Sequence, residues 1–191
     1  MKIQFESCTE AELWEYVASG LLKSGIESVL VGGAVVSIYS SGAYRSGDLD
    51  FIVSALFKGR LPQAMASIGF QKKGRHYIHL QCAHLFVEFP PGPLAIGDDT
   101  SIQPAEKTVH EGLIKILSPT DCIRDRLASF IHFKSRDALD QAVLVARSQP
   151  FDIYRIRSWC EKENSSHAWE EFRRLLAQTG GPILSEGFNK K

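Results

Sequence analysis

The stretch that decides the fold is residues 29–53, VLVGGAVVSIYSSGAYRSGDLDFIV. A short apolar run at its start is followed by Gly32-Gly33. A second apolar run closes the stretch and carries Asp48 and Asp50 at its beginning. Successive side chains on a strand point to opposite faces, so these two aspartates are expected to share a face. Neighbouring carboxylates repel each other and lose solvation when they are buried. The pair therefore needs a partner of opposite charge.

A divalent cation is such a partner. Mg²⁺ takes oxygen ligands and commonly combines one or two carboxylates with substrate phosphates. Gly32-Gly33 lets the backbone approach a ligand closely, and a helix starting there would offer free N–H groups to an anion. Glu88 is the candidate third carboxylate, because it is the only acid between Asp50 and Asp98 and lies late in the apolar run HLFVEF. The pattern predicts a site for a metal ion and a nucleoside triphosphate.

Together with the segments around it, this stretch predicts an α/β (α+β) fold. Thr9 and Glu12 form a capping-box pattern that opens an amphipathic helix. Before residue 118, helices are expected over residues 9–24, 34–41 and 60–68, and strands over residues 28–31, 49–53, 76–81, 84–89 and 113–117.

Beyond residue 117 the pattern becomes helical. Helix starts are expected at Ser118, Ser135 and Asp152, and a fourth helix is expected to end at Gly180-Gly181, before a frayed tail over residues 185–191. We therefore expect a small mixed sheet with flanking helices over residues 1–117 and a helical region over residues 118–191.

Composition narrows the class of protein. The formal net charge of the 191 residues is zero, which disfavours tight, sequence-independent binding of a nucleic-acid backbone. The four cysteines are far apart and are expected to be free thiols in a reducing compartment. The N-terminus does not resemble a signal peptide, and no apolar run is long enough to span a bilayer. These features predict a soluble cytoplasmic protein without a membrane partner, and they leave its oligomeric state open.

The segment HYIHLQCAH raises the alternative of a zinc site. On a strand, His79 would face away from His76, Cys82 and His84, so a single ion could not easily collect all four side chains. This zinc site is disfavoured. His84 would share a face with Glu88, which makes it a candidate to line the same pocket.

The core stretch resembles the nucleotidyltransferase superfamily. The signature of that superfamily is a Gly-Gly or Gly-Ser turn, a short helix and an Asp-x-Asp strand, with a third acid from a later strand. Gly32, Gly33, Asp48, Asp50 and Glu88 fall on those positions. The resemblance covers roughly residues 28–147 and implies transfer of a nucleoside monophosphate from a nucleoside triphosphate to a hydroxyl acceptor, with Mg²⁺ or Mn²⁺.

The resemblance is closest to small bacterial members related to abortive-infection toxins. It implies that Arg45 contacts phosphate, and that Arg126 and Asp140, from the segment LSPTDCIRDRLASFIHFKSRDALDQAVLVA, face the nucleotide. The sequence departs from the superfamily at Gly33, where many members carry a serine that contacts phosphate. Ser37, one helical turn later, is a candidate substitute.

The sequence is compatible with three functions. The leading one is an enzyme in which the three acids hold metal, Gly32 and Gly33 hold phosphates, and Asp50 or Glu88 accepts the acceptor's proton. Its acceptor would be an RNA such as transfer RNA, a protein or a small molecule. The second is a catalytically inert, antitoxin-like binding module on the same scaffold. The third is a toxin that modifies transfer RNA.

Overall fold

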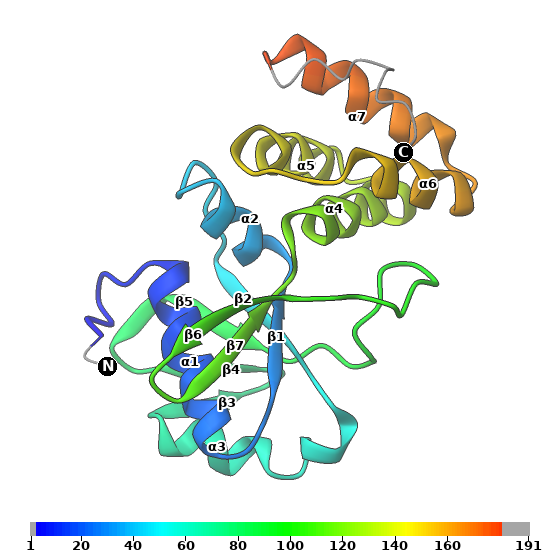
Figure 1. Cartoon of the computed structure of the whole chain (residues 1–191). Coiled ribbons are helices and arrows are strands. Elements are labelled where there is room, and N and C mark those ends of the chain that lie inside the picture. Colours follow the sequence, from blue (N-terminus) through cyan, green and yellow to red (C-terminus); the bar gives the residue numbers. More distant parts are fainter. Residues whose placement is uncertain (1–2, 181–191) are drawn as a thin grey trace.

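The computed structural model describes residues 3–180, which form a mixed sheet with helices on it and at one end of it (Figure 1). The strands are β1 (Ser28–Val31), β2 (Asp48–Val53), β3 (Phe70–Lys73), β4 (His76–His79), β5 (Cys82–Glu88), β6 (Ala105–Val109) and β7 (Gly112–Ile116). The helices are α1 (Glu10–Lys23), α2 (Gly33–Tyr39), α3 (Leu61–Ser67), α4 (Pro119–Phe133), α5 (Arg136–Ser148), α6 (Ile153–Lys162) and α7 (Ser166–Gln178), with a 3₁₀ turn η1 (Ala55–Phe57). The predicted α/β class is confirmed.

The sheet has the strand order β3-β4-β5-β2-β1-β7-β6. Strand β1 pairs with β2 in antiparallel and with β7 in parallel, and β2 pairs with β5 in parallel. The remaining neighbours are antiparallel, which leaves β3 and β6 as the edge strands. The sheet is therefore mixed, as predicted, and β2 lies near its centre between β1 and β5.

Burial alternates along β2 and separates the two faces of the sheet. Leu49, Phe51 and Val53 are almost fully buried, whereas Asp48 and Asp50 are partly exposed. Helices α1 and α3 contact the sheet and each other. Helices α4 to α7 gather at one end of the sheet, and α2 lies between them and the strands (Figure 1). One face of β2 thus belongs to the core, and the face with the aspartates stays accessible.

The helix starts follow the capping signals in the sequence. Thr9 and Glu12 make the predicted capping box at α1. Ser118, Ser135 and Asp152 are the N-caps of α4, α5 and α6, and each side chain accepts a hydrogen bond from a backbone N–H in the first turn. Helix α7 ends at Gln178, and the predicted frayed tail lies outside the described residues.

Several predicted boundaries were wrong. Strands β3 and β6 were not predicted, because their sequences FQKK and AEKTV carry charges where a buried strand would carry apolar residues. The strand predicted over residues 76–81 stops at His79, and the one predicted to start at residue 84 already starts at Cys82, because a tight turn joins them. The helix predicted over residues 34–41 ends at Tyr39, and a turn with Ser41 and Gly42 at positive φ follows it.

Among residues 3–180, no helix combines the length and the apolar character that crossing a bilayer requires.

Candidate functional site

The register of the two central strands brings the three predicted carboxylates to one face of the sheet. Asp50 lies opposite Glu88 in the parallel β2–β5 pair, and Asp48 lies opposite Phe86. Since alternate residues share a face, Asp48, Asp50 and Glu88 all project from the accessible side. Residues 38 positions apart in the sequence (88 − 50) therefore become direct neighbours across a strand pair.

Asp50 is the acid most affected by this arrangement. Burial raises its pKa to about 6, and the negative charges of Asp48 and Glu88 add to that effect, whereas the positive charge of Arg126 opposes it. The site thus holds negative charge poorly when no cation balances it. A bound cation would remove this penalty.

Glu88 points toward the neighbouring strand. Its Oε1 lies 3.1 Å from Nδ1 of His76, which faces it across the β4–β5 pair, and 3.4 Å from Nε of Arg75. Across the part of the chain that the structure describes, the oxygen atoms of the three acids do not form a group that lies within 4.8 Å of one another. To join Asp48 and Asp50 around one ion, the Glu88 side chain would have to leave Arg75 and His76.

The glycine turn lies directly against the aspartates. Val31 pairs with Asp50 in the β1–β2 register, so the next residue, Gly32, lies at the same end of the strand. Gly32 has φ of 75°, and a Cβ atom placed on it would be 2.7 Å from Oδ2 of Asp50. Only glycine fits both the backbone conformation and this close approach. The backbone of the turn is therefore held next to the carboxylates.

A loop between α2 and β2 covers the second glycine of the turn. A Cβ atom on Gly33 would lie 2.9 Å from the Ser46 hydroxyl oxygen and 3.4 Å from the Tyr44 hydroxyl oxygen. The Ser46 hydroxyl donates a hydrogen bond of 2.9 Å to Oδ1 of Asp48. The hydroxyl group beside the glycine turn and the first aspartate therefore comes from Ser46.

Ser37, the predicted substitute for the missing turn serine, lies elsewhere. Its residue is 3% exposed, and its hydroxyl is among the groups that lower the pKa of Glu10. This placement gives Ser37 a role in the packing between α2 and α1. Its predicted contact with phosphate gains no support from the geometry.

Glu10, at the start of α1, holds the loop in place. Its Oε1 accepts a hydrogen bond of 3.0 Å from the Ser46 backbone N–H, and its Oε2 lies 2.8 Å from Nη1 of Arg45. Burial opposes the ionisation of Glu10, but these hydrogen bonds outweigh it, so its pKa is lowered. Arg45, predicted to contact phosphate, is thus engaged by Glu10.

Helix α4 contributes charges that reach Asp50. Arg126 pairs with Asp125 at 2.6 Å and donates a hydrogen bond to Gln141 of α5, and both charges of the pair affect the pKa of Asp50. The structure therefore brings the predicted Arg126 toward the acids. Asp140 is exposed on α5, and it is its neighbour Gln141 that contacts Arg126.

The residues that the sequence did not indicate share one property. Glu10, Tyr44, Ser46 and Asp125 reach the site through contacts between elements that are distant in the chain or through an irregular loop. Ser46 had a local signal, since residues 46 and 48 are two positions apart and can share a side. Glu10 had none, because nothing in its own helix marks it as different from Glu12 or Glu15.

Known proteins resemble this chain in fold rather than in sequence. No family model and no curated protein sequence matches the chain. Among solved structures, an antigenic nucleotidyltransferase-like protein from Paracoccidioides brasiliensis aligns with 73% of this chain and 78% of its own, at 15% identity and a TM-score of 0.52.

Two further structures align with lower TM-scores. The lincosamide antibiotic adenylyltransferase LnuA, bound to lincomycin, aligns with 74% of this chain and 98% of its own, at 14% identity and a TM-score of 0.49. The antibiotic-resistance factor ANT(2'')-Ia aligns with 87% of this chain and 89% of its own, at 13% identity and a TM-score of 0.47. The mixed sheet, the glycine turn after β1 and the likeness to the Paracoccidioides brasiliensis structure show that the chain has a nucleotidyltransferase-like fold.

Proposed function

We propose that this protein is a metal-dependent nucleotidyltransferase that moves a nucleoside monophosphate from a nucleoside triphosphate to a hydroxyl acceptor. The observation that carries the proposal is the register of β2 and β5, which places Glu88 opposite Asp50 and on the same face as Asp48. Three carboxylates gathered beside a glycine turn match the needs of a metal-bound triphosphate. A purely structural role would not require two further acids beside the buried Asp50, whose pKa they help to raise.

The donor set fits Mg²⁺ or Mn²⁺. All three side chains offer oxygen atoms, which these hard cations prefer, and the raised pKa of Asp50 reflects burial together with neighbouring negative charges, both of which a cation would offset. Asp48 and Asp50 would hold the metal directly, and Glu88 would join them after leaving Arg75 and His76. When bound, the metal would neutralise the triphosphate charge and lower the pKa of the acceptor hydroxyl.

The protein's own groups have separate tasks in this proposal. The backbone N–H groups at Gly32 and Gly33 bind phosphate oxygens, because neither glycine carries a side chain and Gly32 lies directly against Asp50. Asp50 or Glu88 accepts the proton of the acceptor hydroxyl, since both project from the face on which the acceptor would bind. Arg126, held by Asp125, supplies positive charge near the triphosphate.

Ser46 takes the task that the superfamily resemblance gives to a turn serine. Its hydroxyl lies where a side chain at Gly33 would begin, and it also fixes the orientation of Asp48. Replacement of Ser46 by alanine should therefore slow transfer by about 10-fold or more, given that a hydrogen bond to a charged group is worth roughly 1.5–3 kcal/mol. Ser37→Ala, which removes a buried hydroxyl that contacts Glu10 and not Asp48, should leave the rate closer to that of the parent protein.

The decisive experiment measures label transfer and pyrophosphate release. The protein is incubated with each of four α-labelled nucleoside triphosphates and Mg²⁺, with total RNA, protein extract or a small-molecule extract as the source of acceptor. We expect one nucleotide to be transferred to one acceptor class. Asp50→Asn should reduce the rate by about 100-fold or more, because several kcal/mol of metal-dependent stabilisation are lost.

The matched control is Asp137→Asn, which changes an exposed aspartate in the first turn of α5. It should leave transfer unchanged. Asp50→Asn should remain folded, since it removes repulsion among the acids, and circular dichroism can verify this. Failure of every nucleotide to be transferred or bound in a metal-dependent way would contradict the proposal and leave an inert, antitoxin-like scaffold.

A further inference from the structure

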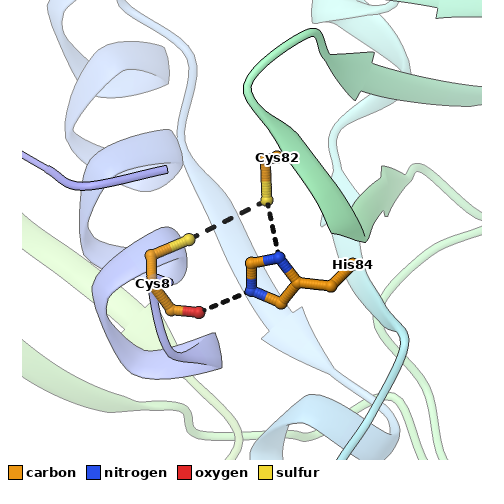
Figure 2. Close-up of side chains that lie close together, drawn as sticks. All are labelled: Cys8, Cys82 and His84. Carbon is orange, nitrogen blue, oxygen red and sulfur yellow. Dashed lines mark hydrogen bonds between the residues drawn. The ribbon is translucent and has the colours of Figure 1, made fainter. Parts of the chain in front are cut away.

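We propose that Cys8, Cys82 and His84 form a second metal site, separate from the three acids, that takes Zn²⁺ or a similarly soft divalent ion. Figure 2 shows the three side chains converging, with Cys8 from the segment before α1 and Cys82 and His84 from β5. One ligand atom from each lies within 4.8 Å of the others. Thiolates and imidazole are the ligands that zinc prefers over oxygen donors.

The two sulfur atoms already have the separation that a tetrahedral zinc ion requires. Zn–S bonds of about 2.3 Å at the tetrahedral angle place two sulfurs roughly 3.8 Å apart. The Sγ atoms of Cys8 and Cys82 are 3.8 Å apart. A disulfide would instead need about 2.05 Å between them, so the pair would have to move much closer. The observed spacing favours a shared ion over a covalent bond.

His84 is oriented as a metal-binding histidine should be. Its Nε2 lies 2.8 Å from the backbone carbonyl oxygen of Cys8, and a carbonyl only accepts hydrogen bonds, so Nε2 carries the proton. Nδ1 of the neutral ring is then unprotonated, and it lies 3.9 Å from Sγ of Cys82. Metal-binding histidines commonly donate their second ring nitrogen to such a carbonyl. The free lone pair therefore points toward the sulfurs.

The site is buried on the sulfur side and open on the imidazole side. Cys8 is 4% and Cys82 is 3% exposed, whereas His84 is exposed. A pocket of about 380 Å³ borders Cys8 and His84, with Glu6, Arg45 and Ser46 on its other sides. Three protein ligands beside a pocket leave the fourth position of the ion for water or a small ligand. The two thiol protons leave to solvent when the metal binds.

Metal binding here would clamp the N-terminal segment onto the sheet. Cys8 is two residues before Glu10, which binds the backbone N–H of Ser46, and Ser46 in turn donates to Asp48. The ion would therefore fix the segment that supports the loop beside the acids. The site itself is inferred from its own ligands and does not depend on the proposed transfer reaction.

The test measures Zn²⁺ binding by the whole chain, reduced with a phosphine and freed of metal. Equilibrium dialysis should give one tightly bound Zn²⁺ per chain, and Co²⁺ should give the visible spectrum of tetrahedral thiolate coordination. Cys82→Ser and Cys8→Ser should each weaken binding by more than about 100-fold, since loss of even an outer partner costs about 10–100-fold. His84→Gln should weaken it as well and should abolish the tetrahedral Co²⁺ spectrum.

The matched control is Cys160→Ser, which alters another buried thiol, in α6. It should retain full binding, as should His110→Gln, which alters an exposed histidine near β7. Circular dichroism establishes that each variant is folded. The proposal fails if the reduced chain binds no zinc or if binding is equal in Cys82→Ser and the parent protein.

Discussion

At the scale of single residues, Gly32 both adopts a backbone conformation that other residues disfavour and allows the close approach to Asp50. Its φ of 75° is unfavourable for other residues, and an added Cβ would meet Asp50 at 2.7 Å. Gly32→Ala should therefore lower the free energy of unfolding by about 2–3 kcal/mol, of which about 1–2 comes from the backbone conformation. Urea denaturation of the two proteins measures the difference.

Gly74 provides the control for this prediction. It has φ of 63°, but nothing lies within 4 Å of a Cβ placed on it. Gly74→Ala should lower the free energy of unfolding only by the cost of the backbone conformation, about 1–2 kcal/mol. Equal losses in the two variants would show that the approach of Gly32 to Asp50 has no energetic consequence.

Cys160 leads to a prediction about alkaline pH. Burial raises the pKa of its thiol from 9.0 to about 12 in the folded chain. Between these values the unfolded chain loses the thiol proton and the folded chain keeps it. The contribution of the neutral thiol to the free energy of unfolding is therefore fully present below pH 9 and is lost as the pH rises toward 12. The fall per thiol approaches about 1.4 kcal/mol per pH unit.

Cys160→Ser removes this titration. The free energy of unfolding, measured in urea at several pH values from 8 to 10.5, should fall less steeply in Cys160→Ser than in the parent protein. Tyrosine and lysine side chains titrate equally in both, so the difference in slope isolates the thiol. Parallel slopes would contradict the prediction.

At the scale of elements, local signals decided what the sequence could predict. The starts of α1, α4, α5 and α6 were predicted because each has a capping side chain at a fixed offset from its first turn. Strand β2 was predicted from its alternation, and the same alternation placed Asp48 and Asp50 on one face. Strands β3 and β6 were missed because an edge strand needs little apolar surface.

For the candidate site too, the sequence indicated the residues that belong to a local pattern and not those that depend on packing between distant elements. The glycine turn and the paired aspartates carry a pattern within one stretch of chain, and Glu88 stood out as an isolated acid in an apolar strand. The contact between Ser46 and Glu10 spans 36 residues, and that between Cys8 and Cys82 spans 74. Such contacts depend on how whole elements pack, and no local period or spacing encodes them. The zinc site suggested by the sequence combined Cys82 with three histidines of the same segment. It did not include Cys8, because no local pattern links that residue to Cys82.

The cap of α4 offers a test of these local signals. The Ser118 hydroxyl accepts a hydrogen bond of 3.2 Å from the Asp121 N–H and donates one of 2.9 Å to the Asp121 carboxylate. Ser118→Ala should lower the free energy of unfolding by about 1–2 kcal/mol. Thermal or urea unfolding would measure it. Ser148→Ala, at the exposed end of α5, should change stability by less than about 0.5 kcal/mol, and an equal effect of both would contradict the capping role.

At the scale of the whole molecule, a buried ion-pair network joins the helical end to the loop that follows β5. Arg124 of α4 is 2% exposed and pairs with Asp121 at 2.8 Å and with Asp99 at 2.5 Å, and Arg155 of α6 also reaches Asp121. Asp121 is fully buried. Removal of Arg124 would leave the buried Asp121 carboxylate with Arg155, which is about half exposed, as its cationic partner.

Arg124→Ala should therefore lower the free energy of unfolding by about 3 kcal/mol, at the lower end of the range for breaking a buried pair. Urea denaturation gives the value. Arg157→Ala, which removes an exposed pair with Glu161 on α6, should cost less than about 0.5 kcal/mol. A small loss in Arg124→Ala would mean that the network adds little to the attachment of the loop.

The strand order has a consequence for how the chain folds during synthesis. Strand β1 occupies the middle of the sheet, yet Val29 pairs with Lys115, which follows it by 86 residues (115 − 29). At about 5–20 residues per second, a ribosome needs roughly 4–17 s to make that interval. Until β7 is made, the edge of β1 that it will pair with presents backbone N–H and C=O groups that have no partner strand. We therefore expect the nascent chain to depend on chaperones until β7 emerges, and chains that terminate before it to aggregate.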